Sequence, residues 1–451
     1  MSTLVLIAIL LCSLLPSRYV VAGLPALWMI QNVFLMPNAA LVHAGPVDIL
    51  PVDLVLISLL LRCALGIAAK KQFVADTPLY AAILIFLAVN FVATLAAGVK
   101  FGEGQFLHCL TSEARLVSEI ALVPVLACAI TTLPQARRCI GILLATLAAL
   151  AAIQFINFFG ASHGITIGEV QGIERGEVRC FGPVGDSVGF VLLLGYVASL
   201  RFASIGGAGA CLGGILLTAG IGSIFAAGVG TVLFLIFGTQ SAEVRAFARR
   251  RLWLLPLLAF AGLAGLALFA RPMAQTLLDR LSSRSYESSG GQRLATATLA
   301  GAMIADNPLL GVGYMGYEPV LAHYGGARLF DLAHPDGGMA NANNQILQAL
   351  TDSGVCGLLA VAALVVCAAR LLRRVAGRCE DQFVSTFFLS AFIWLLALVF
   401  GNLAAVWLNP SSFIARFFWI ILGAAVAVQR LLPAETEDRP IPQESPRLVP
   451  A

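Results

Sequence analysis

The sequence predicts an all-α polytopic membrane protein with about 12 or 13 transmembrane helices and a long loop on the outer side. Of its 451 residues, 59% are hydrophobic and 12% are charged, and the mean hydropathy is +0.91. A soluble domain carries about twice that share of charged residues. Apolar runs of about 20 residues, the length that crosses about 30 Å of hydrocarbon, recur along the chain. These runs leave no room for a large soluble domain.

The apolar runs divide the chain into four regions. Residues 1–271 form an N-terminal bundle of about ten helices, and residues 272–344 form the large outer loop. Residues 345–433 add three helices, and the charged, proline-rich tail 434–451 is expected to be disordered. The expected spans lie near residues 3–15, 18–36, 52–69, 78–98, 114–133, 139–160, 187–202, 208–222, 224–238, 252–271, 345–369, 383–404 and 412–432.

Short basic loops predict the orientation of these helices. They alternate with loops poor in Lys and Arg, and the positive-inside bias makes the basic loops cytoplasmic. Their basic residues are Lys70 and Lys71, Arg137 and Arg138, the cluster Arg245 to Arg251, and Arg370 to Arg378. The net charge of +4 is too small and too scattered to indicate a nucleic-acid partner.

Polar chemistry is predicted to gather on the outer side. Two outer loops are long, at about 161–186 and 272–344, and loops of that length are usually functional. The expected outer residues include all five histidines and four arginines: His43, His108, His163, His323, His334, Arg179, Arg284, Arg293 and Arg328.

The ten cysteines do not indicate a disulfide scaffold. Most lie inside apolar runs, where cysteine acts as a small hydrophobic residue. Only Cys109 and Cys180 fall in segments predicted to be outside, so they are the one pair that could form a bridge. The run from Leu4 to Leu15 has no preceding basic residue and no clear cleavage site, which favours a retained membrane segment.

A polar stripe marks the point where the chain re-enters the membrane after the long loop. At helical spacing, Asn344, Gln348 and Asp352 share one face. Such a stripe is costly against lipid, so it is expected to face the bundle interior or a water-filled cavity. The alternative is ordinary hydrogen bonding between helices.

Three further charges fall near or within apolar runs. Arg115 and Glu119 lie four residues apart, and an internal ion pair that neutralises both is the favoured interpretation. Arg62 lies near the middle of its expected span, where simple snorkelling is a poor explanation. The alternative is that the expected boundaries of this span are wrong. The sequence contains no P-loop, zinc-ligand spacing or nucleophile elbow, and Gly311-Val312-Gly313 lacks the context of a dinucleotide site, so a soluble enzyme is excluded.

At these residues the chain resembles the O-antigen ligase and polymerase superfamily, membrane glycosyltransferases that use glycans linked to undecaprenyl pyrophosphate. In that family a long outer loop opens with an Arg, passes through an Asn/Asp-Pro-Leu-x-Gly-x-Gly turn, and closes on His-Asn, nine residues and Gly-x-x-Gly-Leu. The corresponding elements here are Arg293, then Asp306 to Gly313, then Asn343-Asn344, and finally Gly354 to Leu358. An upstream Arg-x-x-Gly element is echoed by Arg179 to Gly182.

Two departures from the family pattern shift the prediction toward the polymerase branch. The position of the ligase histidine, the general base in the family, holds Asn343, whose amide cannot accept a proton at neutral pH. The family's Ser-Arg pair appears only as Ser223-Ile224. Both changes argue by analogy against a standard ligase.

The resemblance implies displacement of pyrophosphate from a lipid-linked glycan by a sugar hydroxyl, with no cofactor and no metal. Arg179 and Arg293 are expected to stabilise the leaving group, since guanidinium groups match phosphate oxygens. His334, Asp336 and Glu318 are candidates for the base, and Asn343 also belongs to the catalytic set. The expected substrate-binding residues are Asn344, Gln348, Asp352, Arg284 and Arg328.

These features predict a polysaccharide polymerase at the periplasmic face of a bacterial inner membrane. Its substrate would be the lipid-linked oligosaccharide, and its expected partners are a flippase and a chain-length regulator of the same pathway. One alternative is a ligase that transfers the glycan to a lipid acceptor. A second is a glycan transporter or flippase, although the sequence shows no inverted repeat and its charges gather outside.

Overall fold

The structure is a computed structural model, and it describes most of the helical chain. The described residues are 15–34, 42–44, 47–49, 51–68, 77–171, 179–183, 185–218, 220–238, 289–325, 341–342, 344–401, 406–409 and 412–433. The expected span 252–271, nearly all of the expected span 3–15 and the tail 434–451 lie outside them.

The described chain is all-α, as the composition predicted, with two short β-hairpins beside the helices. The hairpins pair β1 (Val42–Ala44) with β2 (Val47–Ile49), and β3 (Glu169–Gln171) with β4 (Arg179–Gly182). The α-helices are α2 (Ser17–Phe34), α3 (Pro51–Ala68), α4 (Pro78–Phe101), α5 (Glu103–Ile120), α6 (Leu122–Ala129), α7 (Leu133–Gly160), α8 (Val188–Arg201), α9 (Ile205–Leu217), α10 (Ile221–Leu233), α14 (Ser289–Asp306), α15 (Tyr317–Val320), α17 (Gln345–Arg378), α18 (Gln382–Gly401) and α19 (Phe413–Leu431).

Five of the described helices are long and apolar enough to cross a membrane: α4, α7, α17, α18 and α19. The helices α8, α9 and α10 are apolar but shorter than the usual 20 residues. One expected span was wrong in its form: residues 114–133 are not one helix, because α5 ends at Ile120 and α6 begins at Leu122. The chain is thus a polytopic membrane protein whose total number of spans stays a prediction.

The centre of the bundle is formed by α18 and α19. In the 18-residue apolar stretch of α19, 78% of the residues are buried within the protein, against 39% in the corresponding stretches of α4 and α17. A helix buried all round belongs to the interior of a bundle, whereas a half-buried apolar helix faces lipid on its other side. The indole of Trp394 on α18 donates a hydrogen bond to the Phe190 carbonyl of α8 at 2.8 Å, which ties the two helices together.

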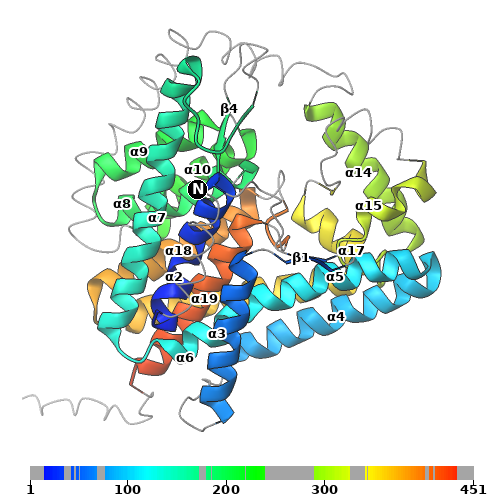
Figure 1. Ribbon diagram of the computed structural model, residues 1–451, viewed down its shortest axis with the longest axis horizontal. Coiled ribbons are helices and arrows are strands. Elements are labelled where there is room, and N and C mark those ends of the chain that lie inside the picture. Colours follow the sequence, from blue (N-terminus) through cyan, green and yellow to red (C-terminus); the bar gives the residue numbers. More distant parts are fainter. Residues whose placement is uncertain are drawn as a thin grey trace, which may run out of the picture.

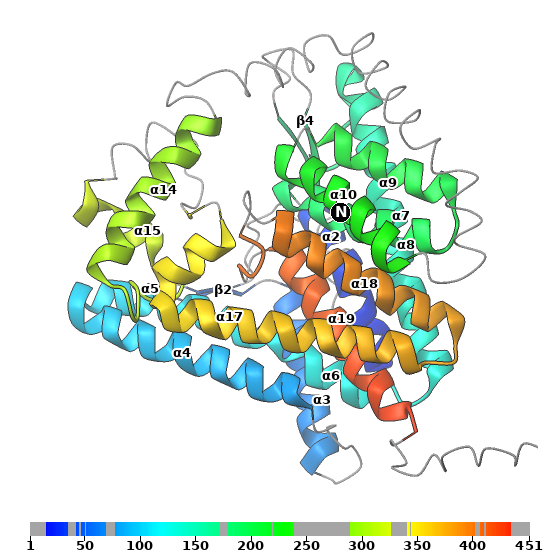
Figure 2. The ribbon, with the colours of Figure 1, turned by 180° about the vertical axis from the view of Figure 1, so that it is seen from behind.

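A second layer lies beside this bundle. The helices α4, α5 and α17 run side by side, and α14 and α15 lie over the N-terminal end of α17 (Figures 1 and 2). A small apolar cluster joins α14 and α15 to the start of α17, and it includes Ala300, Met303, Val312, Tyr317 and Ala342. Part of the expected 272–344 loop is therefore folded structure, with a helix of its own.

Contacts at the two ends of the molecule group residues as the charge bias predicts. At one end Arg378 donates to the Pro433 carbonyl at 2.7 Å, and Arg430 donates to the Ile130 carbonyl at 2.8 Å. Arg378 belongs to a loop predicted to be cytoplasmic, and Ile130, Arg430 and Pro433 lie at or next to the predicted cytoplasmic ends of their spans. At the other end Lys100 donates to Asn307 Oδ1 at 2.6 Å, and both residues belong to segments predicted to be outside.

Candidate active site

The turn that follows α14 has a backbone that its glycines make possible. Gly311 has φ of +63° and Gly313 has φ of +95°, a region that residues with a Cβ rarely adopt. A Cβ on Gly311 would also lie 2.3 Å from the Thr351 carbonyl oxygen. The Pro-Leu-x-Gly-x-Gly pattern is therefore the sequence of a turn that packs backbone against backbone.

The partner of this turn is a break in α17. Ser353 and Gly354 leave the helical conformation, and Gly354 has φ of +62°. A Cβ there would lie 2.2 Å from the Leu309 carbonyl carbon. Both glycine motifs of the sequence thus meet at one contact.

Backbone hydrogen bonds close that contact. Val312 N–H donates to the Thr351 carbonyl at 2.8 Å, and Gly313 N–H donates to the Asp352 carbonyl at 2.9 Å. In return, Val355 N–H donates to the Pro308 carbonyl at 2.9 Å. Groups released by the broken helix would be costly if left unpaired in a membrane, and the turn satisfies them. We call residues 307–316 with residues 351–355 the turn-break interlock.

The predicted polar stripe lies beside the interlock, inside the protein. Asn344 caps α17, because its Oδ1 accepts the N–H groups of Ile346 and Leu347 at 2.8 and 3.2 Å. Gln348 accepts from Ala342 N–H at 2.9 Å and donates to Asp352 Oδ1 at 2.7 Å. Both Gln348 and Asp352 are buried. Their described contacts support the backbone around the site.

Helices α4 and α5 supply polar residues that the sequence analysis did not single out. Gln105 Nε2 donates to the carbonyls of Val312 and Gly316 at 2.8 and 3.1 Å. Ser353 donates to Asn90 Oδ1 at 2.6 Å, and Thr94 donates to Glu113 Oε1 at 2.7 Å. Asn90 and Thr94 interrupt the apolar run 78–98 one helical turn apart, and that signal could have identified them.

Arg293 extends from the face of α14 that packs toward the interlock. Residues 293, 296, 300 and 303 share one helical face. On that face the Thr296 carbonyl accepts a hydrogen bond from the Tyr317 hydroxyl at 2.9 Å, and Ala300 and Met303 are fully buried. Arg293 is half-buried and lies about 10 Å along the axis from Ala300.

Arg179 lies in β4, and that strand pairs with β3 beside the end of α7. Gln171 pairs with Arg179 in this hairpin. The side chain of Asn157 on α7 makes two hydrogen bonds to the backbone of Ile167: its Oδ1 accepts from the Ile167 N–H at 2.6 Å, and its Nδ2 donates to the Ile167 carbonyl at 3.0 Å. The structure describes the backbone of Arg179 and not its side chain, so its approach to Arg293 stays a prediction.

The other predicted site residues divide into two groups. Glu318 lies half-buried in α15. Ser223, which was noted only as a departure from the family's Ser-Arg pair and not as a site residue, is buried in α10 and donates to the Gly220 carbonyl at 2.9 Å. Five predicted residues lie outside the described part of the chain: Asn343, His334, Asp336, Arg284 and Arg328.

The expected ion pair between Arg115 and Glu119 was wrong. Glu119 instead accepts from Arg416 Nε of α19 at 3.1 Å, and Arg115 is exposed. The Arg416 guanidinium also lies 4.0 Å from the Trp28 ring centroid. The sequence separation of nearly 300 residues hid this partner.

Two further expectations are corrected or resolved. Cys109 and Cys180 do not form a bridge, because both are free and buried, in α5 and in β4. Arg62 is half-buried on α3 and donates to the Leu15 carbonyl at 3.0 Å. A carbonyl partner explains how its charge is accommodated within an apolar run.

Residues 206–362 match the family model described as O-antigen ligase. This segment of the chain is thus similar to the O-antigen ligase family. The O-antigen ligase match covers about a third of the chain, from α9 to beyond the break in α17, and so contains the whole turn-break interlock. Arg179 lies outside it. No curated protein matches the chain.

Proposed function

We propose that this membrane protein polymerises lipid-linked oligosaccharide repeat units into a surface or secreted polysaccharide. The observation that carries the proposal is the turn-break interlock, which brings α14, with Arg293 on its packed face, against the start of α17. The two segments that hold the family's sequence elements are thus joined by direct hydrogen bonds. The match of residues 206–362 to the O-antigen ligase family model supports a lipid-linked glycan as substrate.

The proposed reaction is a displacement at the anomeric carbon. The oxygen of an acceptor sugar hydroxyl bonds to that carbon as the bond to the pyrophosphate oxygen breaks. The hydroxyl proton passes to a base, and the lipid pyrophosphate leaves with the bonding electron pair. The departing anion is the species that most needs stabilisation, and Arg293 and Arg179 are assigned to it because a guanidinium stays charged and binds phosphate oxygens in pairs.

The remaining predicted residues take two kinds of role. His334, Asp336 and Glu318 are the candidates for the base, and Arg284 and Arg328 for binding of the anionic substrate. Asn343 orients the acceptor hydroxyl through its amide. Asn344, Gln348 and Asp352 act as positioning residues, since their described contacts fix the start and the break of α17. A flippase and a chain-length regulator are the proposed partners, at the periplasmic face of the inner membrane.

Replacing Arg293 tests the proposal. Arg293→Ala is expected to lower polymer formation by about 30-fold to nearly 1000-fold, because each guanidinium contact to a desolvated phosphate supplies roughly 2–4 kcal/mol. Arg293→Lys should restore only part of the activity. The assay is polymer length and yield in a strain lacking the chromosomal gene, normalised to the amount of inserted protein.

Arg374→Ala is the matched control, because Arg374 is exposed near the opposite end of α17. It removes the same charge and should leave the yield unchanged. Wild-type yield from Arg293→Ala would remove this residue from the site, and full activity of Arg293→Lys would contradict paired contacts to phosphate.

Ligation of the glycan to a lipid acceptor is the second candidate, favoured by the description of the matching family model. Asn343→His separates the two functions. A polymerase should not gain transfer to a lipid-A core, because acceptor choice depends on the pocket as well as on one proton acceptor. Transfer to that core by the His variant, with an inactive parent, would show a ligase disabled at one residue.

A further inference from the structure

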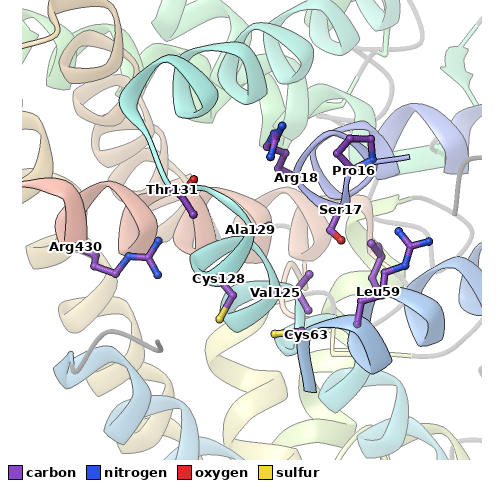
Figure 3. Close-up of a pocket in the computed structure, with 11 residues that line it drawn as sticks. Pro16, Ser17, Arg18, Leu59, Cys63, Val125, Cys128, Ala129, Thr131 and Arg430 are labelled. Atoms are coloured by element: carbon purple, nitrogen blue, oxygen red, sulfur yellow. The ribbon is translucent and has the colours of Figure 1, made fainter. Parts of the chain in front are cut away.

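A cavity of about 590 Å³ lies far along the chain from the interlock residues, among the starts and ends of helices. It is bordered by the start of α2, by α3, by the end of α6 and by the end of α19. Three arginines, Arg18, Arg62 and Arg430, line it, and none of the described lining residues is acidic. In Figure 3, Arg18 and Arg430 lie on either side of Ala129 and Thr131.

The contacts of these arginines hold them in place around the cavity. Arg62 donates to the Leu15 carbonyl at 3.0 Å, and Arg430 donates to the Ile130 carbonyl at 2.8 Å. Arg18 lies 4.9 Å from the Tyr19 ring centroid, and its Nε is buried with no hydrogen-bond partner in the described protein. Like charges gathered around one cavity repel one another, so an anion in it would lower the energy of all three.

The surroundings of the cavity are those of a lipid site. Leu59 and Val125 give it an apolar wall beside the arginines. The surface of the same α3 helix also carries an exposed apolar stripe, which comprises Leu54, Ile57, Leu61 and Leu65. At about 100° per residue this stripe lies on the opposite face of α3 from Leu59, and Arg62 lies between the two faces. A ligand whose anionic head contacts Arg62 could lay its apolar tails along the stripe, whereas a soluble anion would use only the arginines.

We propose that this cavity binds the phosphate-bearing headgroup of an anionic membrane lipid, with its acyl chains along α3. The arginines belong to the end of the molecule that carries the predicted cytoplasmic segments, where basic pockets between helices meet anionic headgroups. Guanidinium groups match the phosphate oxygens in geometry and in charge. The site lies apart from the residues assigned to glycan transfer.

Lipid retention by the purified full-length protein tests this site. The protein is exchanged into mixed micelles with phosphatidylglycerol, cardiolipin or phosphatidylcholine, and bound lipid is counted by native mass spectrometry. The wild type should retain the two anionic lipids and not phosphatidylcholine. Each lost guanidinium should weaken anionic-lipid binding about fivefold, so that R18Q/R62Q/R430Q weakens it about 100-fold.

The matched control is R370Q/R373Q/R374Q, which removes three exposed arginines from α17 outside the cavity. This variant changes the net charge by the same amount as R18Q/R62Q/R430Q, and it should retain as much anionic lipid as the wild type. Thr131 is exposed and lines the cavity, so T131E should repel the headgroup while T131Q, of similar size, should not. This second pair keeps the test valid if the triple variant fails to fold.

Four results would overturn the proposal. They are equal retention of phosphatidylcholine, equal loss in the control triple variant, no difference between T131E and T131Q, and displacement of the lipid by millimolar inorganic phosphate or pyrophosphate at an unchanged lipid concentration. The last result would assign the cavity to a soluble phosphate compound instead.

Discussion

The ion pair between Glu119 and Arg416 joins helices that lie far apart in the chain. Their side chains are only 5% and 15% exposed, and Trp28 of α2 covers the guanidinium. Glu119 Oε2 has no hydrogen-bond partner in the described protein, so Arg416 is the main compensation for this carboxylate. Removing one member of a buried pair leaves a charge that the protein interior cannot solvate.

Arg416→Ala is therefore expected to destabilise the protein by about 3–5 kcal/mol. The double variant E119Q/R416A should be closer to the wild type, because it leaves no buried carboxylate. Arg115→Ala, on an exposed residue one turn away, should change stability by less than about 0.5 kcal/mol. Denaturant unfolding of the detergent-solubilised protein measures all three, and an Arg115 effect as large as that of Arg416 would contradict the pairing.

At the scale of elements, the turn-break interlock depends on backbone contact that a methyl group would prevent. Gly311→Ala and Gly354→Ala should each destabilise the site, because the new Cβ would meet a backbone atom at 2.3 or 2.2 Å and φ is positive at both positions. The expected effect is a lower unfolding temperature together with loss of polymer.

Gly301→Ala is the matched control for both variants. Gly301 lies within α14, and a Cβ there meets no atom within 4 Å. Alanine should stabilise that helix by about 0.5–1 kcal/mol. Normal unfolding temperatures for the Gly311 and Gly354 variants would show that the turn and the break can separate.

Elements with a local cause could be predicted from the sequence, and those with a distant cause could not. Apolar runs predicted α4, α7, α17, α18 and α19, and the family resemblance implied a turn before α17. The division of the expected span 114–133 has a local signal that the sequence analysis did not use, because Pro124 in the first turn of α6 cannot donate a backbone hydrogen bond to the preceding turn. The partner of Glu119 lies on α19, nearly 300 residues away, and no local pattern encodes it. Gln105 was assigned to the loop between the expected spans 78–98 and 114–133, because the polar residues of an amphipathic helix resemble those of a loop.

At the scale of the whole molecule, the contacts divide the loops into two sets without fixing which set faces the cytoplasm. Basic residues gather where α6, α7, α17, α18 and α19 begin or end, and Arg137 lies 3.8 Å from Asp381 there. The interlock lies among segments poor in Lys and Arg. The positive-inside bias makes the basic end cytoplasmic, and the proposed glycan transfer requires the interlock to lie on the other side.

A cysteine at Thr298 should therefore react with an impermeant maleimide in intact spheroplasts, whereas one at Arg374 should react only after lysis. Both positions are exposed, on α14 and on α17. The main native background thiol among the described residues is Cys356, which is free and exposed on α17. Cys180 is buried, and burial raises its pKa to about 12, so it stays protonated and unreactive near neutral pH. Labelling is read as the increase over the parent protein. The reverse pattern, with Arg374 labelled first, would invert the topology and remove the proposed site from the periplasmic face.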